Sequence, residues 1–213
     1  MNSLVPHLRV YLLRHGEVEN SSELKLSGQQ DVLLTSRGEK QSKRLAEILS
    51  QRKISAVFSS DLYRAKRGAE LLAKRLGLKP QKYKELREFN FGEWEGLDWK
   101  EVAEKVKDSE IDWKNFKFPS GESLLQFQER ILRVYQDLIQ NQKGEIAIFA
   151  HGGVNRIILC KELGIPLENM FRIDQSYACL NLIEYYPTAF GGYMPFVRLL
   201  NSDVESLKFL GLV

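Results

Sequence analysis

Two of the three histidines occur in matching sequence contexts that favour a shared site. His15 follows the apolar run 10–13, His151 follows the apolar run 146–150, and each histidine precedes a glycine. Such runs predict strands buried on both faces of a parallel sheet, and these sheets bind ligands beyond the carboxyl ends of their strands. An imidazole placed there can act as a nucleophile or exchange protons near neutral pH. His7 lacks this context and is expected to be a solvated bystander.

Two arginines extend the same pattern. Arg14 directly precedes His15, and Arg64 opens a predicted helix within FSSDLYRA, residues 58–65. A guanidinium is planar and permanently charged, so it can hold a phosphate through two parallel hydrogen bonds. Arg64 by itself is typical of a solvated helix residue. Together with Arg14 and the histidines at one sheet edge, it becomes a candidate clamp for an anion that a histidine attacks.

The elements that position these residues alternate between strands and helices. Apolar runs predict strands at 10–13, 56–58 and 146–150, followed by two later strands at 177–186 and 193–200. Helical periodicity covers 62–76, 124–138 and 154–163, and Ser36 with Glu39 forms a predicted capping box ahead of a helix that includes 45–49. This alternation predicts an α/β protein, a three-layer α-β-α arrangement with a mostly parallel central sheet.

Residues 89–123 interrupt the alternation. The segment holds all three tryptophans, Trp94, Trp99 and Trp113, together with several phenylalanines. A long aromatic insertion in an α/β unit is typical of a lid or specificity loop. A satellite hydrophobic cluster under a long connection explains the composition equally well. We expect one domain over 1–213, with 89–123 as an insertion within it.

Composition and missing motifs exclude several classes of protein. The net charge of +3 comes without a basic block, so no nucleic-acid partner is expected. No apolar run reaches the ~18 residues of a membrane span, and no signal-peptide cleavage site follows the N-terminal apolar stretch, so a cytoplasmic location is expected. Cys160 and Cys179 lie in apolar segments and are expected to be reduced core thiols. The motifs of P-loop kinases, HExxH metallohydrolases, zinc CxxC pairs and GxSxG serine hydrolases are absent from the sequence.

The motifs that are present occur in an order that resembles the histidine phosphatase superfamily, in its phosphoglycerate-mutase-like branch. The matching segments are LLRHGE, the pair Ser27 and Gly28, DVLLTSRGEKQ, SSDLYRA, LREFNFGEWEG, SGES and AHGG. Arg-His-Gly alone is a weak signal, whereas the ordered set covers nearly the whole chain and is specific. The resemblance implies a phosphoglycerate-mutase-like fold.

The resemblance also implies a role for each site residue. His15 would accept the phosphoryl group as phosphohistidine, and its other ring nitrogen would donate to a backbone carbonyl. Glu88 would protonate the leaving oxygen and later activate water. The predicted contacts to the substrate and its phosphoryl group come from Arg14, Arg64, His151, Gly152, Ser21, Ser27 and Gly28. No metal or other cofactor is expected, because arginines and histidines supply the positive charge.

Three positions depart from the pattern of the superfamily. Ser21 stands where an asparagine is common, Lys25 where an arginine is common, and Gly68 where a threonine is common. The first two change the expected contacts with the substrate and leave the core mechanism intact. Gly68 has no functional account, and a glycine within a helix costs about 1 kcal/mol relative to alanine.

The chemistry of the first half-reaction is shared by phosphatases and mutases. A chain of 213 residues lacks room for both the longer insertion and the C-terminal tail of cofactor-dependent mutases, which favours a phosphomonoesterase. The expected substrate is a small phosphorylated metabolite, with α-ribazole 5′-phosphate as one candidate. The alternatives are a phosphoglycerate mutase and a non-catalytic scaffold that binds phosphate. A homodimer through an edge strand or the aromatic insertion stays open.

Overall fold

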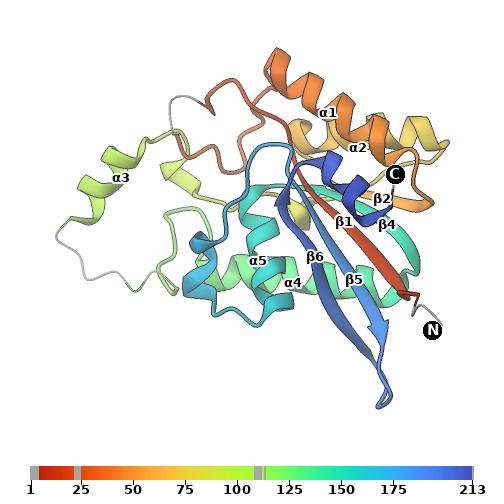
Figure 1. Ribbon diagram of the computed structural model, residues 1–213. Helices are drawn as coiled ribbons and strands as arrows, with labels where there is room; N and C mark the ends of the chain where they lie inside the picture. Colours follow the sequence, from red (N-terminus) through yellow and green to blue (C-terminus); the bar gives the residue numbers. More distant parts are fainter. Residues whose placement is uncertain (1–4, 22–24, 108–111, 113, 213) are drawn as a thin grey trace.

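The computed structural model describes residues 5–21, 25–107, 112 and 114–212. Strands and helices alternate through the first three quarters of the chain, and a hairpin follows (Figure 1). The strands are β1 (Leu8–Arg14), β2 (Ile54–Ser60), β3 (Gln81–Tyr83), β4 (Gly144–Ala150), β5 (Leu180–Pro187) and β6 (Tyr193–Ser202). The α-helices are α1 (Ser36–Leu49), α2 (Tyr63–Leu76), α3 (Trp99–Val106), α4 (Leu124–Asn141) and α5 (Gly152–Leu163).

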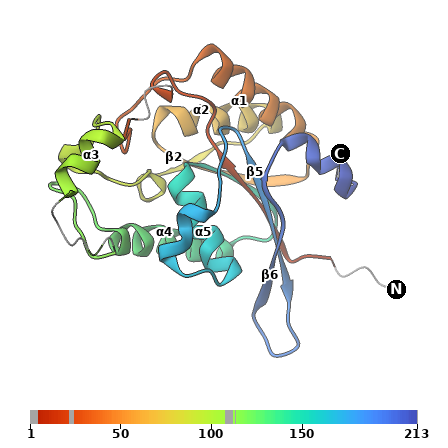
Figure 2. The same cartoon turned by 60° about the vertical axis from the view of Figure 1, so that its left-hand side comes forward.

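The strands form one mixed sheet in the order β3-β2-β4-β1-β5-β6. β1, β2, β3 and β4 run parallel, whereas β5 runs antiparallel to β1 and β6 antiparallel to β5. Helices α1 and α2 cover one face of the sheet and α4 and α5 cover the other, which confirms the predicted α/β architecture (Figures 1 and 2). The β5–β6 hairpin extends past the ends of the other strands (Figure 1).

The predicted strands and helices are all present, most of them with longer bounds, and β3 and α3 were not predicted. The core of β1 and β4 is fully buried, as expected of central parallel strands with helices on both faces. The strand predicted to begin at Tyr177 begins at Leu180 as β5, because 177–179, including Cys179, form the loop ahead of it. Both cysteines are free and buried, which confirms the predicted core thiols.

The predicted capping box of Ser36 and Glu39 is wrong. The N-cap of α1 is Thr35, whose side chain accepts the backbone N–H of Gly38 at 3.0 Å, and Ser36 is the first helical residue. The pattern of a hydroxyl residue followed by glutamate shifted the expected start by one position. Thr35 is also held from outside the helix, since its Oγ1 donates to the Glu17 carboxylate at 2.9 Å and its backbone N–H donates to the Glu17 carbonyl at 3.0 Å.

The aromatic residues of the insertion form a packed cluster. Phe89 packs edge-on against Phe118 and against Phe127 of α4, with ring centroids 5.3 and 5.1 Å apart. Trp94 meets Phe118 in the same edge-on geometry, with centroids 5.1 Å apart. The insertion thus adds to the core on the α4 side of the sheet. Trp113 and the side chain of Trp99 lie outside the described residues.

None of the helices in the described part of the chain combines the length and apolar composition required to cross a bilayer. The described residues also contain no cluster of three or more histidine, cysteine, aspartate or glutamate side chains placed to hold a metal ion.

Candidate active site

The two histidines with matching sequence contexts lie side by side. His15 follows β1 and His151 follows β4, and these strands are parallel neighbours in register from Leu8 with Gly144 to Arg14 with Ala150. The ring centroids of His15 and His151 are 5.2 Å apart, at an interplanar angle of 64°. His15 is 6% exposed and His151 is completely buried. The parallel pairing therefore places both imidazoles at one carboxyl edge of the sheet, as predicted.

The backbone fixes the tautomer of His15. Its Nδ1 lies 2.7 Å from the carbonyl oxygen of Gly16, which can only accept a hydrogen bond, so Nδ1 carries the proton. Burial lowers the pKa of His15 well below its ordinary value, and the positive charges of Arg64 and Arg14 lower it further. The ring is therefore neutral at neutral pH, with the lone pair on Nε2.

A close backbone crossing explains the glycine after His15. A methyl group at Gly16 would lie 2.4 Å from the carbonyl oxygen of Gly38, in the first turn of α1. Real side chains do not approach this closely, so the chain can leave β1 in this direction only with glycine. The Arg-His-Gly triplet thus reflects both the chemistry of the site and the path of the backbone.

Arg14 is held from the loop that precedes β5. Its Nη1 donates to the carbonyl oxygen of Gln175, and its guanidinium stacks 4.0 Å from the ring centroid of Tyr177. Its Nε is buried and has no hydrogen-bond partner among the described residues. Arg14 is therefore fixed in place, with its buried Nε–H left for a ligand.

Arg64 enters the site from the first turn of α2 and is only 2% exposed. Its Nη1 donates to the Gln30 carbonyl at 2.6 Å, and its Nη2 donates to the Gly28 carbonyl at 2.7 Å. Burial lowers the pKa of Arg64, and the carboxylates of Glu88, Asp31 and Glu95 oppose that shift. Arg64 thus combines a buried positive charge with a structural role in holding the 28–30 loop.

His151 is the N-cap residue of α5, and its ring makes no hydrogen bond. Both ring nitrogens are buried without a partner among the described residues. Burial lowers the pKa of His151 well below its ordinary value, and Arg64, His15 and Arg14 lower it further. An unsatisfied buried polar atom costs ~1–3 kcal/mol, so several of them grouped around one nucleophile indicate a ligand position.

Glu88 reaches the same edge from the loop after β3. One carboxylate oxygen accepts the N–H of Phe89 and the other accepts the N–H of Gly153, each at 3.0 Å. Gly153 lies in the first turn of α5, two residues after His151. Glu88 is thereby tied to the helix that begins at the second histidine.

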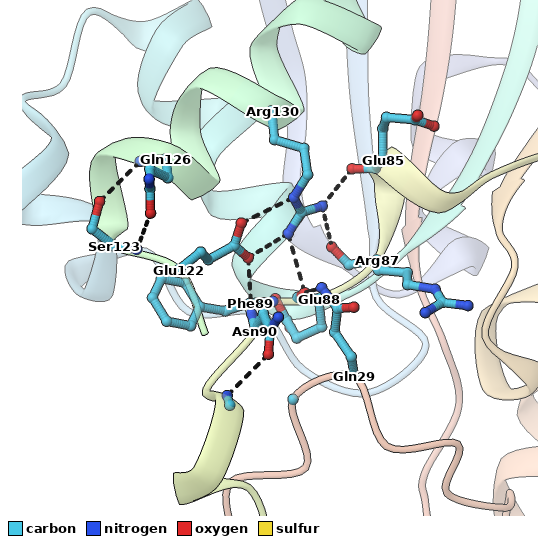
Figure 3. A network of polar contacts seen from close by, with 12 residues as sticks. Gln29, Glu85, Arg87, Glu88, Phe89, Asn90, Glu122, Ser123, Gln126 and Arg130 are labelled. Carbon is cyan, nitrogen blue, oxygen red and sulfur yellow. Dashed lines mark hydrogen bonds and ion pairs between the residues drawn. The ribbon is translucent and has the colours of Figure 1, made fainter. Parts of the chain in front are cut away.

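A clamp of Arg130 and Glu122, which no sequence pattern indicated, holds the segment that carries Glu88 (Figure 3). Arg130 of α4 donates to the carbonyls of Glu85, Arg87 and Glu88 at 2.6, 2.9 and 3.3 Å. The same guanidinium pairs with Glu122 through two nitrogens, at 3.0 and 2.5 Å. The contacts to these carbonyls join residues more than forty positions apart, so neither periodicity nor local spacing indicates them.

Arg156 is a second residue that the sequence patterns did not single out. It lies four positions after Gly152, on the same face of α5. A methyl group placed at Gly152 would lie 3.1 Å from Arg156 Nη1 and 3.5 Å from Arg14 Nε. Two guanidinium groups therefore meet over Gly152. A basic residue one helical turn after the glycine is the sequence signal that could have identified it.

The predicted contacts of Ser21, Ser27 and Gly28 with substrate have less direct support than those of the residues above. Gly28 presents its carbonyl to Arg64, and Ser27 exchanges hydrogen bonds with Asn20 at 2.9 and 3.3 Å. The backbone N–H of Ser21 donates to the Val18 carbonyl at 3.0 Å. These bonds stabilise the loop, and contact of Ser21, Ser27 and Gly28 with substrate stays a prediction.

Known proteins are similar to this chain in sequence and in fold. Residues 10–191 match the family model of the histidine phosphatase superfamily, branch 1. Phosphoglycerate mutase-like protein 4 of Arabidopsis thaliana is 36% identical over 160 residues, which cover 71% of this chain and 70% of that protein. Adenosylcobalamin/alpha-ribazole phosphatase of Escherichia coli is 28% identical over 203 residues, which cover 92% of this chain and 96% of that protein. The crystal structure of the alpha-ribazole phosphatase from Shigella flexneri has a TM-score of 0.78 at 27% identity, and the match covers 91% of this chain and 96% of that one. The fold is therefore phosphoglycerate-mutase-like, and the chain is an enzyme that belongs to branch 1 of the histidine phosphatase superfamily.

Proposed function

We propose that the chain is a metal-independent phosphomonoesterase that hydrolyses a small phosphorylated metabolite through a phosphohistidine on His15. The observation that carries this proposal is the group of unpartnered buried atoms beside a neutral imidazole. Arg14 Nε and both ring nitrogens of His151 have no protein partner among the described residues. The ring centroids of His15 and His151 are 5.2 Å apart. A phosphoryl group would supply acceptors for the Nε–H of Arg14 and for the one ring N–H of neutral His151.

In the first step, the lone pair on His15 Nε2 attacks phosphorus while the ester P–O bond breaks. The proton stays on Nδ1, which donates to the Gly16 carbonyl, so the ring keeps its orientation during attack. Glu88 gives its proton to the departing ester oxygen, and the alcohol leaves. The product of this step is phosphohistidine with an ionised Glu88.

In the second step, Glu88 takes a proton from water as the water oxygen bonds to phosphorus. The N–P bond breaks, inorganic phosphate is released, and His15 returns to its neutral form. Glu88 is thus acid in one step and base in the next. The two N–H groups that hold its carboxylate, from Phe89 and Gly153, keep it in position for both.

Positive charge around the phosphoryl group offsets the negative charge on its equatorial oxygens. Arg14 and Arg64 supply permanent charges, and His151 supplies a ring N–H donor. The N-terminus of α5 lies at the same edge, where its dipole favours an anion. Removing one such donor typically costs ~10²–10³ in rate.

The substrate is a small phosphorylated metabolite on this proposal. The alpha-ribazole phosphatases among its relatives, at 27% and 28% identity, make α-ribazole 5′-phosphate one candidate. A phosphoglycerate mutase is the second candidate function, favoured by the similarity to the mutase-like protein of Arabidopsis thaliana. A mutase uses the same first step and passes the phosphoryl group to a second hydroxyl of the retained substrate.

The test is phosphate release from nitrophenyl phosphate in a chelator, with His15→Ala as the control. We expect turnover by the native protein and none by the variant, and acid-labile phosphate bound to the native chain after rapid quenching. Absence of release from the native protein would overturn the phosphatase proposal. Interconversion of phosphoglycerates only after addition of a bisphosphorylated primer would establish the mutase instead, and binding of phosphate without turnover would establish the scaffold.

A further inference from the structure

Arg156 brings a positive charge to the site that the hydrolysis steps do not use. Its Nε donates to the Ile173 carbonyl at 2.7 Å, which fixes the plane of the guanidinium. Its Nη1 lies over Gly152 beside Arg14 Nε, within 3.1 and 3.5 Å of the same point. The terminal nitrogens of Arg156 therefore lie next to the group that we assign to the phosphoryl.

The charge of Arg156 lacks a paired carboxylate within the described part of the chain. No ion pair joins it to any described aspartate or glutamate, although most of the other buried or half-buried arginines have one. Burial lowers the pKa of Arg156, the more distant carboxylates of Glu88 and Asp174 oppose that shift, and Arg14 adds to it. The guanidinium groups of Arg14 and Arg156 repel each other, so an anionic ligand bound beside both relieves the repulsion.

We propose that Arg156 binds a carboxylate of the substrate, so that the preferred substrates are phosphomonoesters with a carboxylate a few bonds from the ester oxygen. This inference rests on the proposed function and narrows its substrate class. Arg14 and Arg64 hold the phosphoryl group, and Arg156 holds the second anion across Gly152.

A carboxylate fits this position better than a second phosphate. A single guanidinium offers one positive charge and a planar fork, which match the single charge and two oxygens of a carboxylate. A second phosphate carries up to two charges and would require further cations. Phe171, which is 71% exposed and 5.9 Å from the Arg156 guanidinium by ring centroid, adds an apolar surface beside it without adding charge. On this inference α-ribazole 5′-phosphate, which has no carboxylate, is a poorer substrate.

The experiment compares substrates that differ in the carboxylate. O-phosphoserine is paired with O-phosphoethanolamine, and 3-phosphoglycerate is paired with glycerol 3-phosphate. In at least one pair we expect kcat/KM to favour the carboxylate by about 10- to 100-fold, the range of hydrogen bonds to charged groups. The Arg156→Gln variant should bring that ratio close to one. Arg198→Gln, which removes an arginine of β6 outside the site, should keep the native ratio.

Each outcome of this comparison either supports or overturns the role of Arg156. Equal kcat/KM within both pairs for the native protein, or an equal loss for both members of a pair in Arg156→Gln, would overturn the inference. If Arg156→Gln does not fold, Arg156→Lys replaces it, and a native ratio in that variant would overturn the inference because lysine has no fork. Hydrolysis of nitrophenyl phosphate by the native protein separates the two proposals. If it is absent, the phosphatase function fails, and if it is present without a carboxylate preference, only the role of Arg156 fails.

Discussion

The carboxylate of Glu88 accepts the backbone N–H of Gly153 at 3.0 Å, across 65 positions of sequence. A methyl group at Gly153 would lie 2.3 Å from the same carboxylate, so a larger residue there would displace Glu88 from this position. The bond joins the candidate proton donor to the helix that begins at His151. The structure therefore holds the candidate acid Glu88, the N-terminus of α5 and the two histidines as one unit.

Glu88→Gln should lower turnover most for substrates with poor leaving groups. An alkyl alkoxide requires a proton as it departs, whereas nitrophenolate leaves without one, so the loss should be ~10²–10⁴ for alkyl phosphates and much smaller for nitrophenyl phosphate. Steady-state kinetics with both substrate types measure the difference. Equal losses for the two substrates would remove Glu88 from the role of acid.

Arg130→Met should both destabilise the protein and mimic part of the Glu88 defect. The variant leaves Glu122 unpaired in a position that is 13% exposed, with an expected loss of up to about 3 kcal/mol in the free energy of unfolding. The carbonyls of Glu85, Arg87 and Glu88 lose their donor at the same time. We therefore expect kcat to fall more for alkyl phosphates than for nitrophenyl phosphate.

The matched control for Arg130→Met is Lys82→Met, which breaks an exposed ion pair with Glu70. Its expected cost is below ~1 kcal/mol, with no change in leaving-group dependence. Urea unfolding and kinetics on both variants measure these effects. If Arg130→Met were as mild as Lys82→Met, the clamp would not position the acid.

The free energy of unfolding should decrease as the pH is lowered below the ordinary pKa of histidine. Folding lowers the pKa of His15 and His151 from 6.5 by burial and by the nearby arginines. The unfolded state therefore binds protons below about pH 6.5 that the folded state does not, and stability decreases by up to about 1.4 kcal/mol per pH unit for each histidine. Above that pH both states are neutral at these groups, and the effect vanishes.

Urea unfolding between about pH 7.5 and 5.5 tests this dependence. The His151→Gln variant retains every other titrating group, so the difference in slope between it and the native protein isolates His151. We expect the variant to lose less stability on acidification. Identical slopes would show that His151 is protonated in the folded state to the same extent as in the unfolded state.

Gly68→Ala should destabilise the protein although alanine is the better helix former. Propensity alone predicts a gain of about 1 kcal/mol. A methyl group at Gly68 would lie 2.7 Å from two ring atoms of Phe149 in β4, and such overpacking costs ~1–3 kcal/mol. Urea unfolding should show a net loss, and adding Phe149→Leu should recover part of it. A more stable Gly68→Ala variant would contradict the packing argument. Gly68, which had no functional account, thus has a structural one.

The parallel core and the histidine pair follow from the order of the amino acids alone. Buried strands of a parallel sheet require uninterrupted apolar runs, and their carboxyl ends share one edge, so the positions of His15 and His151 after two such runs place both at that edge. The strand order decides that β1 and β4 are neighbours and that the two rings therefore meet. Arg14 and Arg64 follow from the same rule. Helix periodicity predicts α1, α2, α4 and α5 with errors at their ends, such as the cap at Thr35 instead of Ser36, whereas α3 was not predicted.

The rest of the site is assembled by tertiary packing. Glu88, Gly153, Arg130 and Glu122 come from separate segments of the chain, and their hydrogen bonds depend on distances between elements that no local pattern encodes. The unpaired charge of Arg156 is likewise visible only once its neighbours are placed. Periodicity reports which face of an element is buried. It does not report which polar groups meet there, because those contacts depend on the packing of side chains from distant parts of the chain.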